Sequence, residues 1–465
     1  MTFSSDGENF CYDRLLLDPE EASFSDLLYL LFSSDIKSRR FVECPEEHKF
    51  RNFSDRWLIF ISIIFQKIFL YIRNPLARIG HALETWLNLV AINGGIFLLL
   101  IKFLRGNMVR IDRSAVNFRS LIGNLDQRVE MDGNIKPGNR KYKSHLALMA
   151  SKLSYENEAC IKSVVTDHWR MEFLGFYNFW NEYQKKPSTQ AFILEDKKTD
   201  PNLIVIAFRG TEPFDANAWL TDVDLSWYEL QGVGKIHRGF MHALGLQKDG
   251  WPNDVAPTNL YAYYEFRRML KEILSKNGNA KFIVTGHSLG GALAILLVGI
   301  LALHEEGWLL DRMEGVYTFG QPRVGDRKFG RFMEEKLKEF DVRYLRYVYC
   351  NDLVPRLPYD DSALLYNHFG RCLYYDSFYH AKDLLEEPNK NYFNLFWVIP
   401  KNLNACWELI RGLMMPCVGL DYREGWFLKV YRLIGLVLPG LSAHAPQDYN
   451  NSTRLGSLPQ QHHQD

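Results

Sequence analysis

The sequence predicts an α/β fold in which helices cover the faces of a mostly parallel sheet. From about residue 144 onward, short runs rich in β-branched and aromatic residues alternate with helical stretches. This alternation favours parallel strands, because each intervening helix packs back onto the sheet that its strands form. The predicted strands are residues 191–195, 203–208, 281–285, 315–320, 342–350 and 371–376.

Composition places the chain among ordinary globular proteins, since 47% of its 465 residues are hydrophobic and 24% are charged. Lys plus Arg and Asp plus Glu number 55 each, so no overall charge favours a nucleic-acid partner. The seven cysteines are odd in number and form no CxxC pair. They argue against a disulfide framework or a zinc site and favour a reducing, intracellular setting. The polar, acidic start SSDGEN does not resemble a secretory signal.

Residues 1–140 are expected to form an extension that carries an apolar anchor at 57–101 and then a linker. The anchor contains two apolar arms, residues 57–72 and 86–101. As a helix, either arm would reach about 24 Å at 1.5 Å per residue, which is short of the roughly 30 Å of a bilayer core. The polar connector 73–80 contains a Pro and a Gly and predicts a break between the arms.

The favoured interpretation of these arms is a hairpin or helix pair embedded in one leaflet of a membrane or lipid-droplet surface. Between residues 51 and 119 the chain has ten Lys and Arg against three acidic residues, and this excess favours an anionic surface. Two alternatives remain open, namely a pair of buried core helices and a pair of true membrane spans. Residues 141–455 are expected to form the catalytic domain, and 456–465 a polar tail.

The sharpest motif is Gly286-His287-Ser288-Leu289-Gly290, which lies between a predicted buried strand and a long apolar helix. A G-x-S-x-G match alone is weak, but strand, sharp turn and helix together predict the nucleophile elbow of an α/β-hydrolase. Small residues at 286 and 290 let the strand and helix approach closely. The hydroxyl of Ser288 then projects above the sheet at a helix N-terminus, which favours a developing negative charge.

A serine nucleophile needs a base, and the base needs an orienting carboxylate. In this fold the acid and then the histidine follow the serine. Asp352 directly follows a predicted strand, and His444 lies in a loop of small residues after a long apolar run. We therefore predict that Asp352 and His444 complete the triad, although His368 and His380 remain possible. His304 lies on the helix after Ser288 and is expected to point away, while 462 and 463 lie in the polar tail.

The oxyanion of an acyl-transfer intermediate needs two donors, and the backbone N–H of Leu289 is the first that we expect. The second is expected from Thr211, because the sequence Arg-Gly-Thr follows the strand 203–208. Residues 212–230 mix acids with Trp and Tyr and predict a short amphipathic lid with a face for lipid. A surface helix packed on the core is the alternative.

These motifs together resemble the class 3 lipase family over roughly residues 140–450. The resemblance rests on AFRGT (207–211), HRGF (237–240), TGHSLGG (285–291), FGQPRVGD (319–326), NDLVPRLP (351–358) and the Ala-His pair at 443–444. It implies a Ser-Asp-His triad at 288, 352 and 444, with Thr211 and Leu289 as the oxyanion hole. The apolar extension and the ending SAHAPQDYNNSTRLG are similar to plant oil-body triacylglycerol lipases, which implies droplet localisation and triacylglycerol hydrolysis.

The chain departs from compact members of the family in the long interval between Asp352 and His444. This interval contains the apolar, aromatic segment 393–415, which could widen an acyl groove, contact lipid or mediate self-association. No metal or organic cofactor is expected, and the expected partners are a lipid substrate and a lipid surface. A phospholipase A1 or galactolipase, and a non-catalytic lipase-like interaction protein, are the competing hypotheses.

Overall fold

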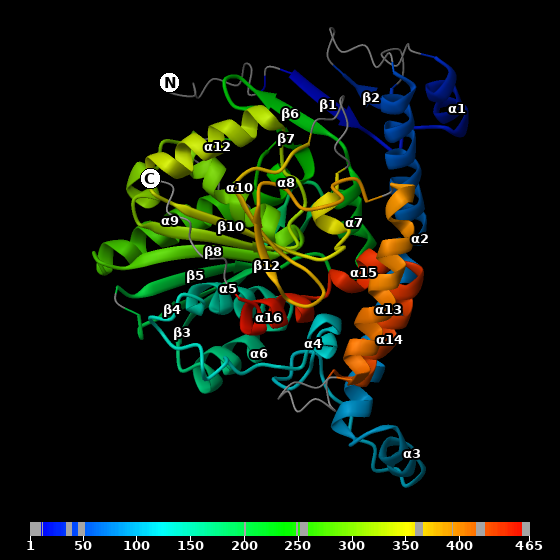
Figure 1. Cartoon of the computed structure of the whole chain (residues 1–465), viewed down its shortest axis with the longest axis vertical. Coiled ribbons are helices and arrows are strands. Elements are labelled where there is room, and N and C mark those ends of the chain that lie inside the picture. Colours follow the sequence, from blue (N-terminus) through cyan, green and yellow to red (C-terminus); the bar gives the residue numbers. More distant parts are fainter. Residues whose placement is uncertain are drawn as a thin grey trace.

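An eight-stranded sheet forms the centre of the computed structural model, in the order β12-β11-β10-β9-β8-β5-β4-β3 (Figure 1). The structure describes residues 11, 13–33, 40–44, 52–199, 201–247, 250–251, 259–358, 366–392, 394–414 and 424–457. Five neighbouring strands are parallel, namely β5 (Leu203–Phe208), β8 (Lys281–His287), β9 (Met313–Phe319), β10 (Arg343–Tyr349) and β11 (Arg371–Tyr375). The antiparallel edges are β3 (Glu172–Asn181) and β4 (Lys186–Asp196) on one side and β12 (Ala381–Leu384) on the other.

Helices cover both faces of this sheet, and each face has its own apolar core. One core contains α8 (Arg238–Leu244), α9 (Ala262–Lys276), α10 (Leu289–Leu303) and α12 (Arg327–Glu339). The other contains α5 (Tyr142–Leu153), α6 (Glu158–Ser163) and α16 (Pro446–Leu455). Every residue of α10 is buried, which suits a helix that is apolar all round. A largely parallel sheet between two helical layers confirms the expected α/β-hydrolase fold.

A second, smaller sheet joins the N-terminal extension to the catalytic region. Its order is β2-β1-β6-β7, formed by Val42–Glu43, Asp13–Leu17, Trp227–Leu230 and Gly234–His237. Strand β1 pairs antiparallel with β6, so residues more than 200 apart in sequence share one ladder. The short helix α1 (Phe24–Phe32) packs on the helix that follows it. The extension is therefore part of the folded body.

The expected hairpin of two apolar arms is wrong, because the connector is helical. Helix α2 runs without interruption from Phe53 to Ile92 and includes Pro75. Proline removes one backbone donor and disfavours a helix interior, but contacts on both sides of it hold α2 in place. Ser62 Oγ donates to the carbonyl of Val223 (2.7 Å), and Gly80 lies against Phe214.

The break comes later, at residues 93–95, inside the segment that we expected as the second arm. Gly94 and Gly95 have φ of +86° and +107°, a region that L-residues rarely adopt. Helix α3 (Ile96–Leu104) follows at 86° to α2. Within the described ranges, no single helix is both long and apolar enough to cross a bilayer, and only α2 and α3 as a bent pair pass that test by length and composition.

The segment expected as a linker also packs on the body. Helix α4 (Leu121–Leu125) is fully buried, and the buried Asp126 lies between Arg128 and Lys152 of α5. The domain boundary at residue 140 thus stays a prediction. Side chains from both sides of this boundary pack on each other, as Asp126 and Lys152 do. Of the expected tail 456–465, residues 458–465 lie outside the described ranges.

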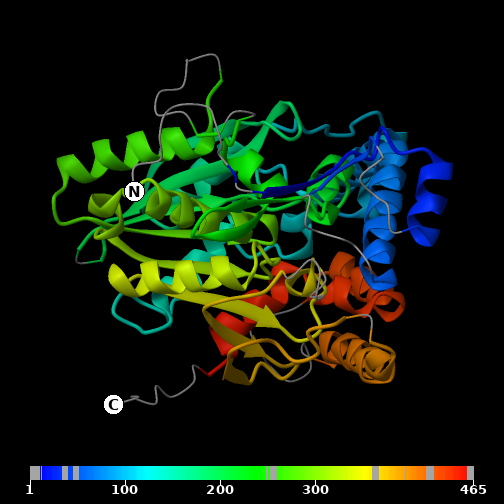
Figure 2. The ribbon, with the colours of Figure 1, turned by 90° about the horizontal axis from the view of Figure 1, so that it is seen from above.

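After β12, the insert that precedes His444 folds mainly into helices along one flank of the molecule. Helices α13 (Val398–Met414) and α14 (Trp426–Val437) lie side by side with α2 (Figures 1 and 2). The rings of Trp86 on α2 and Trp426 on α14 meet edge to face, with centroids 5.8 Å apart. The short helix α15 (Pro439–Ala443) then leads directly to His444. The remaining short elements are η1 (Val164–His168), α7 (Ala216–Val223), α11 (Gly307–Leu310), η2 (Val354–Arg356) and η3 (Leu395–Trp397).

Gly80→Val should destabilise the protein by about 1–3 kcal/mol, the usual cost of overpacking. A Cβ at Gly80 would lie 2.5 Å from the Cβ of Phe214, so α2 would have to move from the segment that precedes α7. Ala77→Val is the matched control, because it adds a valine to an exposed position of the same helix. Urea unfolding of both variants measures the difference, and equal midpoints would show that this contact does not hold α2.

Candidate active site

The nucleophile elbow forms where β8 passes into α10. Ser288 has φ 59° and ψ −132°, a strained conformation for a residue with a side chain. The turn is tight: a Cβ on Gly286 would lie 2.1 Å from the backbone of Gly290, and a Cβ on Gly290 would lie 2.4 Å from the carbonyl oxygen of Phe208. Glycine at both positions therefore allows strand, turn and helix to approach, and Ser288 stands at the N-terminus of α10.

Asp352 and His444 meet although 92 residues separate them. Asp352 follows β10 and is fully buried, while His444 follows α15. The imidazole Nδ1 lies 3.0 and 2.8 Å from the two carboxylate oxygens, and the backbone N–H of Val354 donates to Oδ1 (2.9 Å). This contact leaves Nε2 as the ring nitrogen available for a proton from a substrate or a nucleophile.

Ser288 belongs to the same cluster at the carboxyl ends of β8, β9 and β10. Its backbone N–H donates to the carbonyl of Phe319 (2.8 Å). A Cβ on the next residue, Gly320, would lie 2.9 Å from His444 Cε1 and 2.8 Å from Asp352 Oδ2. Among the described side chains no hydrogen bond joins Ser288 Oγ to His444, and such bonds often shorten only when substrate is present.

Two further side chains, which the sequence did not single out as partners, contact the predicted triad residues Asp352 and His444. The hydroxyl of Tyr449, on α16, donates to Asp352 Oδ2 (2.5 Å) and accepts from the backbone N–H of Tyr349 (3.3 Å). No local sequence signal marks this tyrosine, because only the folded chain brings α16 beside β10. Burial, and then the charge of Asp352, raise the pKa of Tyr449 well above its usual value, so its proton stays in place.

His287 contacts the backbone of His444. Its Nε2 lies 2.9 Å from the carbonyl oxygen of His444, and its Nδ1 lies 2.9 Å from the hydroxyl of Tyr155. A carbonyl only accepts, so Nε2 carries the proton and Nδ1 accepts from Tyr155. Burial, and then the nearby His444, lower the pKa of His287 well below its usual value, which keeps the ring neutral.

The residues expected to bind the oxyanion lie next to the elbow. A Cβ on Gly210 would lie 2.4 Å from the carbonyl of His287 and 3.1 Å from Ser288 Cβ, so the end of β5 touches the nucleophile turn. Thr211 follows, is buried, and donates its hydroxyl to Asp222 on α7 (2.8 Å). The acids within residues 212–230 were the only sequence signal for this partner. Burial raises the pKa of Asp222 to about 7.

The expected lid differs from the helix that the structure shows. Leu220, Trp227 and Tyr228 are buried, and the last two lie in β6. Helix α7 packs against α2, and Val223 at its end accepts the hydrogen bond from Ser62. The expected apolar face toward lipid is therefore wrong for this stretch, because the N-terminal extension and the small sheet cover it.

The other candidate histidines have different partners. His368 Nε2 lies 2.6 Å from the carbonyl of Pro355 and close to Glu387, while His380 is exposed beside Asp376. His304 directly follows α10, at the end opposite Ser288, and contacts the hydroxyl of Tyr263 on α9. Of these downstream histidines within the described ranges, only His444 meets Asp352. The two histidines at 462 and 463 lie outside the described residues.

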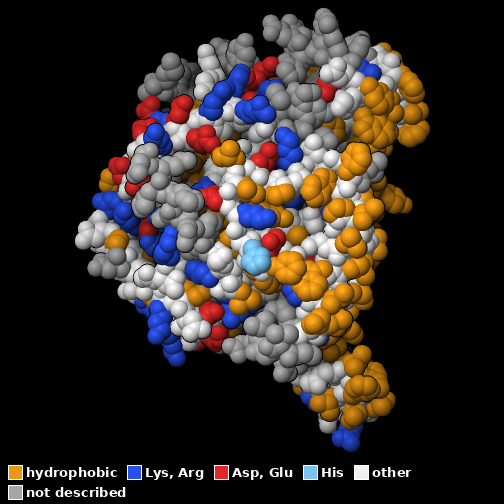
Figure 3. All heavy atoms as spheres, in the orientation of Figure 1, with side chains coloured by type: hydrophobic (Ala, Val, Ile, Leu, Met, Phe, Trp, Pro, Cys, Tyr) orange, Lys and Arg blue, Asp and Glu red, His pale blue; other side chains and the backbone are white. Residues whose placement is uncertain are grey.

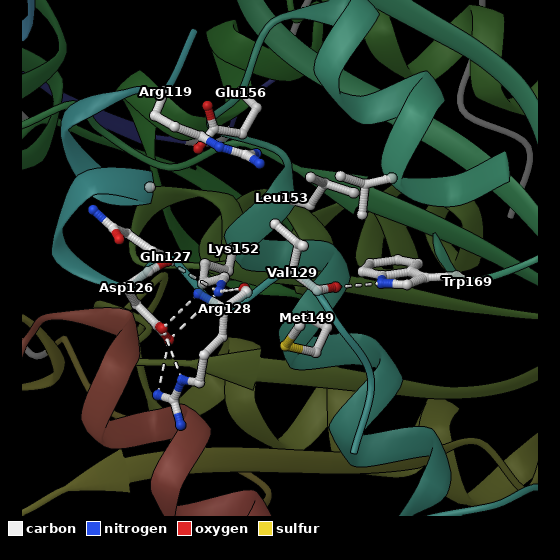
Figure 4. A pocket seen from close by; sticks show the side chains of 12 residues that line it. Arg119, Asp126, Gln127, Arg128, Val129, Met149, Lys152, Leu153, Glu156 and Trp169 are labelled. Carbon is white, nitrogen blue, oxygen red and sulfur yellow. Dashed lines mark hydrogen bonds and ion pairs between the residues drawn. The ribbon is translucent and has the colours of Figure 1, made fainter. Parts of the chain in front are cut away.

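A recess beside α5 is lined by charged and apolar side chains (Figure 4). Asp126, Arg128 and Lys152 form ion pairs there, and Trp169 Nε1 donates to the carbonyl of Val129. None of the predicted site residues lines it. Its polar groups bind one another, so it serves to fix the segment before α5. Among the described residues, no group of three or more His, Cys, Asp or Glu is arranged to hold a metal ion.

Fold and site together define an α/β-hydrolase with a serine elbow and an adjacent histidine–carboxylate pair. Residues 205–362 match the family model described as Lipase (class 3). The chain is similar to triacylglycerol lipase OBL1 of Arabidopsis thaliana (43% identical, covering 95% of this chain and 94% of that protein). It is also similar to triacylglycerol lipase OBL1 of Ricinus communis (37% identical, 95% of each).

Among solved structures, the chain is similar to the lipase from Rhizopus microsporus var. chinensis, with 22% identity and a TM-score of 0.37 over 56% of this chain and 84% of that one. The protein belongs to the class 3 lipase family. This membership confirms both the family and the enzyme class that the sequence predicts.

Asp222→Asn should gain stability relative to the parent protein as the pH rises from about 4 to about 7. In this window the unfolded chain has released the proton that folded Asp222 keeps, so rising pH destabilises the parent by up to roughly 1.4 kcal/mol per pH unit. Asparagine cannot ionise and lacks this dependence. Urea unfolding of both proteins at several pH values tests it, and a constant difference would contradict the raised pKa of Asp222.

Proposed function

We propose that the protein is a triacylglycerol lipase that acts at a lipid-droplet surface through a Ser288–His444–Asp352 triad. The observation that carries the proposal is the contact between His444 Nδ1 and the buried Asp352 carboxylate, next to the strained elbow at Ser288. The names of the OBL1 relatives, which align over nearly the whole chain, support triacylglycerol as the substrate.

In the proposed mechanism, His444 Nε2 takes the proton of Ser288 Oγ while this oxygen attacks the ester carbonyl. Asp352 holds Nδ1–H and stabilises the imidazolium that forms. The same proton then passes to the leaving glyceride oxygen, and an acyl-enzyme remains. Water, deprotonated by His444, attacks the acyl carbonyl and releases the fatty acid, and the proton returns to Ser288.

The N–H of Leu289 and the Thr211 residue are proposed to stabilise the oxyanion. Leu289 is the first residue of α10, so its N–H has no partner inside the helix and stays available. Thr211 is held by Asp222, which fixes its rotamer before the charge develops. Donors fixed in advance are more effective, and losing one costs roughly 3–4 kcal/mol of transition-state stabilisation.

Ser288→Ala should abolish both triacylglycerol hydrolysis and labelling by a fluorophosphonate probe, because the variant lacks the attacking oxygen. Ser275→Ala, at an exposed serine on α9, is the matched control and should keep both. Asp352→Asn should lower kcat by about 10⁴-fold, as loss of the orienting carboxylate does in serine hydrolases.

The substrate class is tested by profiling the purified enzyme on triolein emulsion, phosphatidylcholine vesicles and galactolipid dispersions beside Ser288→Ala. Turnover chiefly of triolein supports the proposal. Faster turnover of either polar lipid would assign a phospholipase A1 or a galactolipase, and no labelling or turnover at all would assign a non-catalytic interaction protein.

Tyr449→Phe should lower kcat by about tenfold with little change in KM, since a hydrogen bond to a charged group contributes roughly 1.5–3 kcal/mol. Loss of the hydroxyl removes a donor from Asp352 and should also move the acidic limb of the pH–rate profile. Tyr379→Phe is the control. It removes a hydroxyl that donates to Asp448, the residue before Tyr449 on α16, and not to Asp352, so the pH profile of this variant should stay unchanged. Identical pH profiles for all three proteins would contradict a positioning role.

A further inference from the structure

Large apolar side chains are exposed mostly on four helices, α2, α3, α13 and α14. They form a continuous band along one edge of the molecule (Figure 3). A typical soluble monomer shows apolar patches of only a few hundred Å², so a band that follows helices of 40, 9, 17 and 12 residues needs an explanation. Its members on the two insert helices are Val398, Ile399, Leu403, Ile410, Leu413, Met414, Trp426, Val430, Leu433, Ile434 and Val437.

The insert helices are arranged with charged residues inside and apolar residues outside. Arg411 of α13 and Arg432 of α14 are buried and pair with Asp448 of α16, and Arg432 also pairs with the buried Glu424. Glu408 of α13 lies in the same cluster. Val437 and Ile399 are 79% and 71% exposed. A helix in water shows the opposite arrangement, so the outer side of this pair is suited to an apolar medium.

Both halves of the band, α2 with α3 and α13 with α14, connect to the proposed catalytic site. Helix α14 is followed by α15 and then at once by His444. The cluster that holds the insert includes Asp448, whose neighbour Tyr449 donates to Asp352. On the other side, α2 packs against α7, which carries the Asp222 partner of Thr211. An apolar surface seated on this band would thus contact helices that lead to His444 on one side and to α7, which carries Asp222, on the other.

The charges of the N-terminal half favour a lipid surface over a second copy of the chain. Arg73, Arg78 and Arg105 are exposed on or directly after α2 and α3, and Lys102 is partly exposed. These cations would lie among anionic phospholipid headgroups while the apolar side chains enter the acyl layer. Two copies packed through this band would bring the same cations together, which is unfavourable.

We propose that the exposed sides of α2, α3, α13 and α14 form one lipid-docking face. Helices α2 and α3 form its N-terminal half, and α13 and α14 form the other half. Its occupant is the phospholipid monolayer that covers a neutral-lipid droplet. The inference deepens the proposed function, because the face would hold the Ser288 site against its substrate. It also assigns a role to the insert between Asp352 and His444, which the sequence left undecided.

The test is flotation of the full-length protein with triolein droplets coated by phosphatidylcholine and phosphatidylserine. The double variant Leu433→Asp/Val437→Asp places two charges on the outer side of α14. Both residues are exposed, so the free energy of unfolding should stay unchanged. The ratio of bound to free protein should fall by roughly tenfold or more, because two large apolar side chains no longer leave water. Leu260→Asp/Leu385→Asp changes two exposed apolar residues outside the face and should float like the parent protein.

Three results would overturn the inference. Equal flotation of the α14 pair and the control pair would exclude the insert from the docking face. Equal or tighter binding of the parent protein to bilayer vesicles of the same phospholipids would reject the droplet monolayer. A parent dimer that the α14 pair converts to monomer, with flotation unchanged, would assign the face to self-association.

Ser288→Ala separates this inference from the proposed function, because it should float normally while it hydrolyses nothing. If the parent protein floats but does not hydrolyse triolein, the proposed function fails and the docking face stands. If the double variant on α14 unfolds at the same temperature as the parent protein, its weaker flotation comes from the changed surface and not from misfolding.

Discussion

The buried carboxylate of Asp352 is the constraint on which the rest of the site depends. A charge that is fully removed from water is unfavourable unless hydrogen bonds replace its hydration. Here the replacement comes from His444 after α15, Tyr449 on α16 and the backbone of Val354. Two of these donors, His444 and Tyr449, follow the long insert in the sequence. The interval between Asp352 and His444 must therefore fold correctly before the carboxylate is satisfied.

The insert meets this requirement through a second buried cluster of charges. Arg411 and Arg432 pair with Asp448, which is adjacent to Tyr449. Glu408 and Glu424 in turn pair with Arg432. Breaking a buried pair leaves an uncompensated charge, so such clusters specify one arrangement even where they add little net stability. The same contacts that position Tyr449 also orient the apolar sides of α13 and α14 outward. Site geometry and surface character are thus two results of one set of interactions.

The N-terminal extension acts on the opposite side of the site. Strand β1 completes a small sheet with β6 and β7, and α2 lies against α7. Together they cover the stretch expected as a mobile lid and hold Asp222 beside Thr211. The extension therefore packs on the region around Ser288, and a clean cut at residue 140 would remove the contacts that hold α7 and its Asp222 beside Thr211.

The sequence by itself determined the features that local chemistry controls. The strand–turn–helix pattern around Ser288 predicted the elbow, and the alternation of strands and helices predicted the sheet. Asp352 and His444 could be proposed from their places after a strand and in a small-residue loop. Their contact, and the supporting roles of Tyr449 and Asp222, required the tertiary structure because these residues meet across long sequence separations. Pro75 predicted a break that packing of α2 overrides, whereas glycines with positive φ placed the break at residues 93–95. Only the folded chain decides which side of a helix faces inward, since buried charges on α13 and α14 turn the apolar residues toward the outside.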